Sequence, residues 1–145
     1  MDVDQEKCYR AEWDFLTAKT NYPFMNIDDV QRFSKRIFKS KTWSALWKDY
    51  IEEDFSRMFS GYPTVNEMAQ NNQEYQGQTD GTAVYLNTDT GMNLYTLLHE
   101  LAHTLGHMHH GQAYRRCLLT LVGRFMGAAH RKELTTQFKK QQLSI

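Results

Sequence analysis

The chain has 145 residues with 17 basic and 17 acidic side chains, so its formal net charge at neutral pH is zero. Its aromatic content of 13% and charged content of 23% are typical of a folded globular protein and exclude a disordered chain. No apolar run reaches the length of about 18 residues that a membrane-spanning helix needs. The length predicts one domain, over residues 1–145.

Helical periodicity dominates the first third of the chain. Asp2 or Asp4 can cap the first predicted helix, and Asn26 can cap the second. We expect three helices here, over about residues 4–19, 27–39 and 40–59. The first ten residues are polar and acidic, so we expect no signal peptide and a cytoplasmic protein with reduced cysteines.

The period changes after the turn signal Gly61-Tyr62-Pro63. We expect strands over residues 64–69, 74–76 and 82–87, the last of which is rich in residues of high β-propensity. An apolar helix then runs from about Leu94 to a stop at Gly106. A long helix is predicted over residues 111–125, and a basic helix or tail over 130–145, partly docked through Phe138 and Leu143. Together these elements predict an α+β fold.

The apolar helix before Gly106 contains the string H-E-x-x-H, from His99 to His103. Positions i and i+4 share one face of a helix, so the two histidines can bind one metal ion. Glu100 lies beside the first histidine and can reach a water that the ion activates. The pattern therefore predicts a catalytic zinc site with Glu100 as general base.

A catalytic zinc needs a third protein ligand, and two histidines compete for this role. His109 completes the string H-E-x-x-H-x-x-G-x-x-H, which is the metzincin spacing. His110 instead precedes the next helix, where Tyr114 lies four residues further on and can pack beneath it. The spacing leaves both histidines open as the third ligand. The metzincin spacing also calls for a methionine turn, and Met126 lies inside a predicted helix instead.

At this point the chain resembles the SprT-like zinc metallopeptidases, especially small actinobacterial and phage proteins described as metallohydrolases. The resemblance covers about residues 80–127, with H-E-L-A-H, the H-G-x-x-aromatic run from His110 to Tyr114, and L-L-T-L-V-G-R-F-M-G at residues 118–127. A weaker resemblance covers K-C-Y-R-A-E-W at residues 7–13. Tyr114 stands where the family has Phe, and Gln112 where it has Pro.

The resemblance implies a zincin-like fold in which a small sheet packs on helices beside the metal-binding helix. It implies that His99, His103 and His110 bind Zn²⁺, and that a free strand edge pairs with an extended protein or peptide substrate. Either 82–87 or 64–69 can form that edge. It also implies substrates attached to DNA.

The implied activity is hydrolysis of a peptide bond by a zinc-activated water. An oxyanion stabiliser is also needed, and Tyr114, Tyr85 and Arg115 are candidates. Two alternatives remain open. The protein can be a phage or mobile-element protease that cuts one specific repressor. It can also be a non-catalytic, zinc-stabilised binding module, if His109 and His110 both bind the ion and close the site.

Charge is unevenly distributed along the chain. Residues 1–110 contain 10 basic and 16 acidic side chains, whereas residues 111–145 contain 7 basic side chains and one acid, Glu133. A basic last third can contact DNA or an acidic partner, or it can pair with the acidic part of the same chain.

Overall fold

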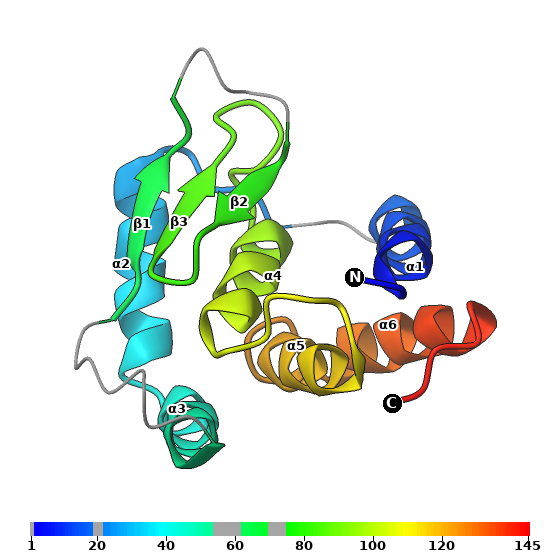
Figure 1. Cartoon of the computed structure of the whole chain (residues 1–145). Coiled ribbons are helices and arrows are strands. Elements are labelled where there is room, and N and C mark those ends of the chain that lie inside the picture. The colour runs from blue at the N-terminus through cyan, green and yellow to red at the C-terminus, as the bar shows by residue number, and fades with distance from the viewer. Residues whose placement is uncertain (1, 19–21, 54–61, 70–74) are drawn as a thin grey trace.

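We describe the fold from a computed structural model, which covers residues 2–18, 22–53, 62–69 and 75–145 (Figure 1). Within these residues the chain is α+β, with six helices and one three-stranded sheet. The helices are α1 (Gln5–Ala18), α2 (Ile27–Phe38), α3 (Lys41–Glu53), α4 (Leu94–Thr104), α5 (Gln112–Phe125) and α6 (Ala128–Lys140). The strands are β1 (Thr64–Glu67), β2 (Gly77–Thr79) and β3 (Ala83–Leu86).

Most of the predicted elements are confirmed, because their signals are local. Asn26 caps α2 as expected, its side-chain oxygen accepting a hydrogen bond from the backbone N–H of Asp29 at 3.0 Å. The helix predicted over residues 40–59 is seen as far as Glu53, and its last residues lie outside the described part of the chain. None of the described helices is both long and apolar enough to cross a membrane.

The strand predicted over residues 74–76 is wrong, because Tyr75 and Gln76 lie outside the sheet and pairing begins at Gly77. The turn between β2 and β3 explains the difference. The Asp80 carboxylate accepts hydrogen bonds from the backbone N–H groups of Thr82 and Ala83, at 2.8 and 2.9 Å. This tight turn lets antiparallel pairing begin directly at Thr79, which lies opposite Val84.

The sheet has the strand order β1-β3-β2, with β3 parallel to β1 and antiparallel to β2. Helix α2 packs against β1, and α4 packs against β2 and β3. Residues 82–87 therefore supply the central strand and cannot offer a free edge. Of the two expected segments, 64–69 does supply an outer strand, β1, whereas the outer strand beside α4 is β2, which neither segment contains (Figure 1).

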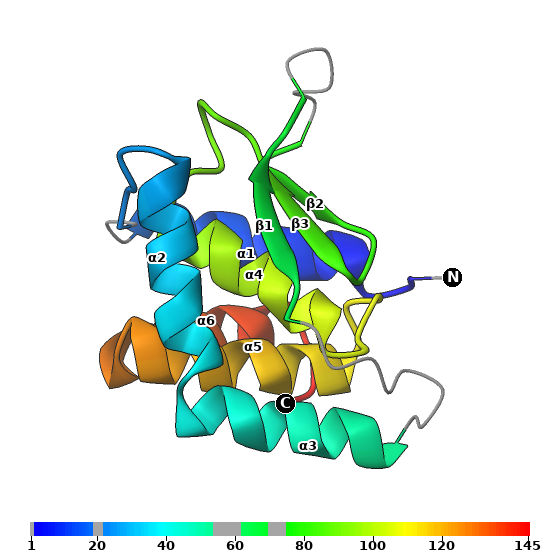
Figure 2. The same ribbon diagram turned by 90° about the vertical axis from the view of Figure 1, so that its left-hand side faces the viewer.

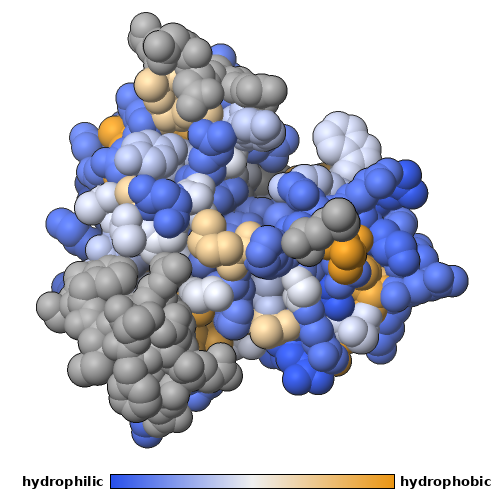
Figure 3. All heavy atoms as spheres, viewed as in Figure 1, coloured by the Kyte–Doolittle hydropathy of each residue, from blue (hydrophilic) through white to orange (hydrophobic). Residues whose placement is uncertain are grey.

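Helix α4 is the centre of the molecule. All its residues except His99 are buried, and it lies between the sheet and a group formed by α1, α5 and α6 (Figures 1 and 2). On the face seen in Figure 3, hydrophilic residues cover most of the surface and hydrophobic ones form only small separate areas. Most apolar side chains of the helices thus pack into one hydrophobic core around α4.

The C-terminal segment docks through the two apolar residues that the sequence suggests. Helix α6 begins at Ala128, two residues earlier than expected, after Gly127 with a φ of 106°. Phe138 and Leu143 are both buried, with 0% and 5% of their surfaces exposed, so the expected docking through these two residues is confirmed. Their burial follows from the packing of α6 against both α1 and α5, which brings the first and last helices side by side.

Gly91, in the connection between β3 and α4, has no room for a side chain. A Cβ at this position would lie 1.8 Å from the carbonyl oxygen of Gln76. We expect Gly91→Ala to lower the free energy of unfolding by about 2–4 kcal/mol, because backbone must move to relieve the clash. Urea unfolding measures this. Gly111→Ala is the control, with nothing within 4 Å of its added Cβ, and equal losses in the two variants would contradict the packing described.

Candidate metal centre

Helix α4 places two of the predicted ligands. Asn93 caps its first turn, accepting a hydrogen bond from the backbone N–H of Thr96 at 2.8 Å. His99 and His103 follow on one face, one turn apart, with ring centroids separated by 5.0 Å. The helix ends at Thr104, and Gly106 adopts a φ of 92°, a left-handed conformation that favours glycine. This turn reverses the chain and leads it back toward the two histidines.

The returning chain brings His110 to the same point. Ligand atoms of His99, His103 and His110 all lie within 4.8 Å of one another. His110 is only 3% exposed and directly precedes Gly111, the N-terminal cap of α5. The side chain of His109 is instead 69% exposed, and its Nδ1 lies 3.8 Å from Asp2. Of the two candidates for the third ligand, the structure groups His110 with the others.

Each of the three rings is held through its Nδ1 atom. The acceptors are Glu12 for His99 at 2.6 Å, Asp2 for His110 at 2.6 Å and the carbonyl oxygen of His107 for His103 at 2.5 Å. Carboxylates and carbonyls only accept hydrogen bonds, so each Nδ1 carries a proton. In the neutral rings each Nε2 then keeps a free lone pair, which is the form that binds a metal.

The Nε2 atom of His110 gives a direct test of whether a metal fits. Among the side chains that the structure describes, it is a buried nitrogen with no hydrogen-bond partner. A buried nitrogen without a partner is costly unless something binds it. A metal ion between the three rings satisfies this atom, so the donor set fits a metal.

The charges around the three histidines also favour metal binding. Burial alone would lower the pKa of His99, but the Glu12 carboxylate outweighs it and raises this pKa to about 9. Burial raises the pKa of Glu12, yet the charge of His99 and the hydrogen bonds from His99 and Tyr95 lower it overall. Burial and the charge of His99 lower the pKa of His103 to about 3. His103 is therefore a neutral ligand at neutral pH, whereas His99 must release a proton when a metal binds.

The Glu100 carboxylate lies beside the three rings without joining them. Its Oε1 is 3.9 Å from the Nε2 of His99, and the residue is 7% exposed. Burial raises its pKa, Glu12 raises it further, and the attraction of His99 opposes them. Gly77 of β2 packs directly against it, since a Cβ there would come within 2.9 Å of the Glu100 Cγ. The glycine thus allows the sheet edge to approach the carboxylate closely.

The three expected oxyanion candidates occupy different environments. Tyr114 is 1% exposed, stacks on His103 with ring centroids 4.3 Å apart, and donates a hydrogen bond to the carbonyl oxygen of His99. Arg115 is 2% exposed and donates to Asp4 and to the carbonyl oxygen of His110. Both are therefore placed to hold the ligands rather than to touch a substrate. Tyr85 is 38% exposed and lines the open cleft.

Glu12 and Asp2 are residues of the candidate site that sequence reasoning missed. They hold His99 and His110 from 87 and 108 positions away along the chain. Glu12 did leave a signal, because it interrupts the apolar face of α1, between the buried residues Cys8 and Phe15. Asp2 left none, since an acidic residue ahead of a helix is an ordinary cap.

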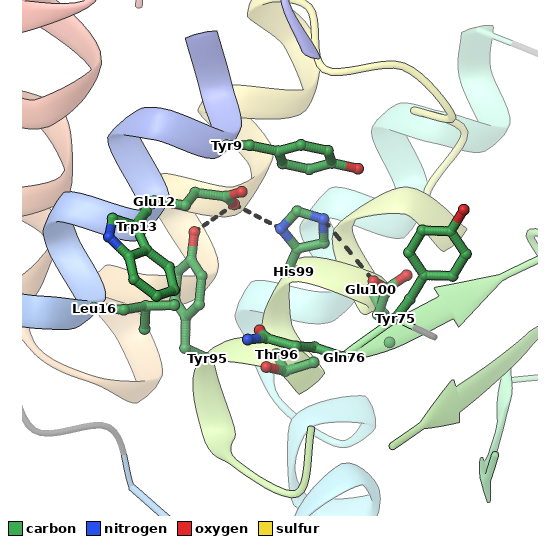
Figure 4. A pocket seen from close by; sticks show the side chains of 11 residues that line it. Tyr9, Glu12, Trp13, Leu16, Tyr75, Gln76, Tyr95, Thr96, His99 and Glu100 are labelled. Atoms are coloured by element: carbon green, nitrogen blue, oxygen red, sulfur yellow. Dashed lines mark hydrogen bonds and ion pairs between the residues drawn. The ribbon is translucent and has the colours of Figure 1, made fainter. Parts of the chain in front are cut away.

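Two cavities meet at the site. The larger, of about 700 Å³, runs from β2 past the three histidines, and Tyr85 and Met108 lie along it. The smaller, of about 240 Å³, lies between α1 and α4 (Figure 4). Tyr9, Tyr75, Gly77, His99 and Glu100 line both. His99 and Glu100 therefore lie where one cavity joins the other.

We expect Glu12→Gln to weaken zinc binding about 10–100-fold, because a neutral amide then replaces the charged carboxylate that accepts the hydrogen bond from the His99 Nδ1. Competition with a chromophoric zinc chelator measures the affinity. Glu6→Gln on the same helix is the control, since Glu6 is exposed and pairs with Arg10 at 2.6 Å. Equal affinities of the Glu12→Gln variant and the unaltered chain would show that Glu12 does not support the site.

We found no significant match of this chain to any protein-family model, to any curated protein or to any solved structure. In the candidate site, three histidines can hold a metal ion beside a buried glutamate and an open cleft.

Proposed function

We propose that this protein is a zinc-dependent metallopeptidase in which Glu100 is the general base. One arrangement carries the proposal. The Nε2 atoms of three histidines converge while their Nδ1 atoms are held, and the Glu100 carboxylate stands beside them on an open cleft. A purely structural metal site has no need of a carboxylate that stays outside the ligand set.

Zinc is the metal that this donor set fits best. Three imidazole ligands with carboxylate and carbonyl partners on their outer nitrogens are typical of catalytic zinc. His99, His103 and His110 would hold it. When bound, zinc lowers the pKa of water to about 7 and polarises a carbonyl group. The exposed side chain of His109 lies outside this group, which argues against a site closed by four histidines.

Glu100 supplies the proton chemistry. Its raised pKa brings the carboxylate closer to the operating pH, as a general base requires. It takes a proton from the attacking water and gives it to the leaving amine. The charge that develops on the carbonyl oxygen needs a donor, and Tyr9, Tyr75 and Tyr85 are exposed tyrosines that line the cleft. Two of these, Tyr9 and Tyr75, were not among the expected candidates.

The substrate we propose is an extended segment of a protein or peptide. Strand β2 is an outer strand in the described part of the sheet, and Gly77 at its start touches Glu100. A peptide pairing with this edge would carry its backbone past the carboxylate. The H-E-x-x-H helix beside a small mixed sheet also supports the proposed zincin-like fold and the resemblance to SprT-like enzymes.

Contact with DNA is part of the proposal. All the basic residues after His110 are exposed except Arg115, which is buried and paired with Asp4. We expect double-stranded DNA to stimulate cleavage, and to do so more weakly at higher salt. An unchanged rate on adding DNA would remove this link and favour a specific protein target, such as a repressor.

The test is metal content together with hydrolysis. We expect about one zinc ion per chain, cleavage of a denatured protein or peptide mixture, loss of cleavage with a chelator, and its recovery with added zinc. Zinc bound without cleavage of any substrate would favour a zinc-stabilised binding module. No bound zinc would leave the histidines as core residues and end the proposal.

A further inference from the structure

We propose that the smaller cavity is a subsite that accepts one aromatic side chain of the substrate, next to the bond that is cut. This inference rests on the proposed peptidase function. The cavity lies between α1 and α4, and residues 75–77, which lead into β2 and include its first residue, also line it (Figure 4). His99 and Glu100 form part of its wall, so whatever fills it is adjacent to the reacting atoms.

Its walls are suited to a flat apolar group. Four aromatic side chains and Leu16 line it, and among the described lining residues there is no lysine or arginine. The aromatic residues are Tyr9, Trp13, Tyr75 and Tyr95. Aromatic rings pack favourably edge-to-face or offset against one another, beyond the gain from burial alone. An aromatic substrate side chain therefore gains more here than an aliphatic one of similar size.

The two acidic residues that line the cavity, Glu12 and Glu100, do not favour a positively charged substrate side chain. One Glu12 oxygen accepts hydrogen bonds from both His99 and Tyr95, at 2.6 and 2.5 Å. Its charge is thus balanced within the protein, and Glu100 is committed to the reaction. A lysine or arginine of the substrate would lose its hydration without gaining a free carboxylate.

The size of the cavity limits its occupant to one side chain. Its volume is about 240 Å³, below the roughly 300–1,000 Å³ of pockets that hold whole small-molecule ligands. One wall is preformed, because Tyr95 is 2% exposed, is fixed by Glu12 and packs on Phe15. Trp13 and Tyr75, 64% and 53% exposed, form the rim. Large aromatic surfaces left exposed beside a reactive site are the part that a bound side chain would cover.

The first test compares peptides that differ at one position. A series with Phe, Leu, Ala or Lys is made on each side of the bond that is cut, with all other residues constant. We expect kcat/KM for Phe to exceed that for Ala about 10–100-fold on one side of the bond, with Lys no better than Ala. Cleavage of all these peptides at similar rates would overturn the subsite but leave the peptidase function standing.

Two variants locate the preference in the cavity. Trp13→Ala removes part of the rim and should reduce the Phe-to-Ala ratio several-fold. Gln76→Trp places a ring from an exposed position into the cavity and should bring the ratio close to one. Met108→Ala is the matched control, because Met108 lines the larger cavity and does not line the smaller one. It should leave the ratio as it was, and a change equal to that in Trp13→Ala would contradict the assignment.

A binding measurement keeps the subsite testable apart from turnover. In zinc-loaded Glu100→Gln protein, the indole N–H resonance of Trp13 is assigned by comparison with Trp13→Phe. We expect the Phe peptide to shift this resonance and the Ala peptide to leave it in place. If no peptide is cleaved by the unaltered protein, the proposed function fails, while this titration still decides whether the cavity binds an aromatic side chain. Equal shifts with both peptides would overturn the subsite.

Discussion

Replacing Glu100 by glutamine is expected to lower kcat for peptide hydrolysis about 10²–10⁴-fold and to leave the zinc content unchanged. The carboxylate is 3.9 Å from the His99 Nε2 and is not one of the three grouped ligands, so the metal does not need it. Glutamine has nearly the same shape and keeps the contact with Gly77. The loss should therefore come from the missing base and not from repacking.

Metal analysis and steady-state kinetics on the same samples measure both effects. Glu67→Gln is a suitable control, because Glu67 is an exposed glutamate at the end of β1, on the far edge of the sheet. Its kcat should match that of the unaltered chain. Full activity in Glu100→Gln protein that retains zinc would disprove the mechanism.

Replacing His110 by alanine is expected to weaken zinc binding by more than about 100-fold, whereas His109→Ala should change it little. His110 is buried, its Nδ1 is fixed by Asp2, and its Nε2 is left for the ion. His109 points its side chain into solvent. Zinc content per chain after dialysis against a weak chelator distinguishes the neighbours.

The other outcomes each have a definite meaning. Loss of zinc only with His109→Ala would indicate the metzincin spacing and a different arrangement of the loop after Gly106. Loss with either variant would indicate a site closed by four protein ligands, and hence a structural role.

The features of this site that could be predicted from the sequence are those that depend on residues close together in the chain. The i, i+4 spacing of His99 and His103, the stop at Gly106 and the strand before the helix are all local patterns, and the structure contains each of them. The choice between His109 and His110 is different. It depends on Asp2, which binds both the backbone N–H and the ring of His110 across 108 residues of chain.

The sheet shows the same difference between features set by local sequence and features set by distant contacts. Strand β3 was predictable from its β-branched and aromatic residues, but its central place depends on partners from both sides. Strand β2 is only Gly-Gln-Thr, without an apolar alternation to reveal it. It forms because the Asp80 turn folds it onto β3 and because Gly77 can approach α4. Neither cause is visible as a pattern in the residues of β2 themselves.

The fixing of His110 by distant parts of the chain has a consequence for folding. Asp2 holds its ring, while Arg115 joins its carbonyl oxygen to Asp4 and to the backbone of Ser144. An unfolded chain can offer zinc the His99–His103 pair, but the third nitrogen is positioned only after both ends of the chain have docked. Assembly of the complete centre is thus a late, high-contact-order step. We therefore expect the proposed zinc ion to stabilise the whole tertiary structure, by about 4 kcal/mol when free zinc exceeds its dissociation constant about 1,000-fold.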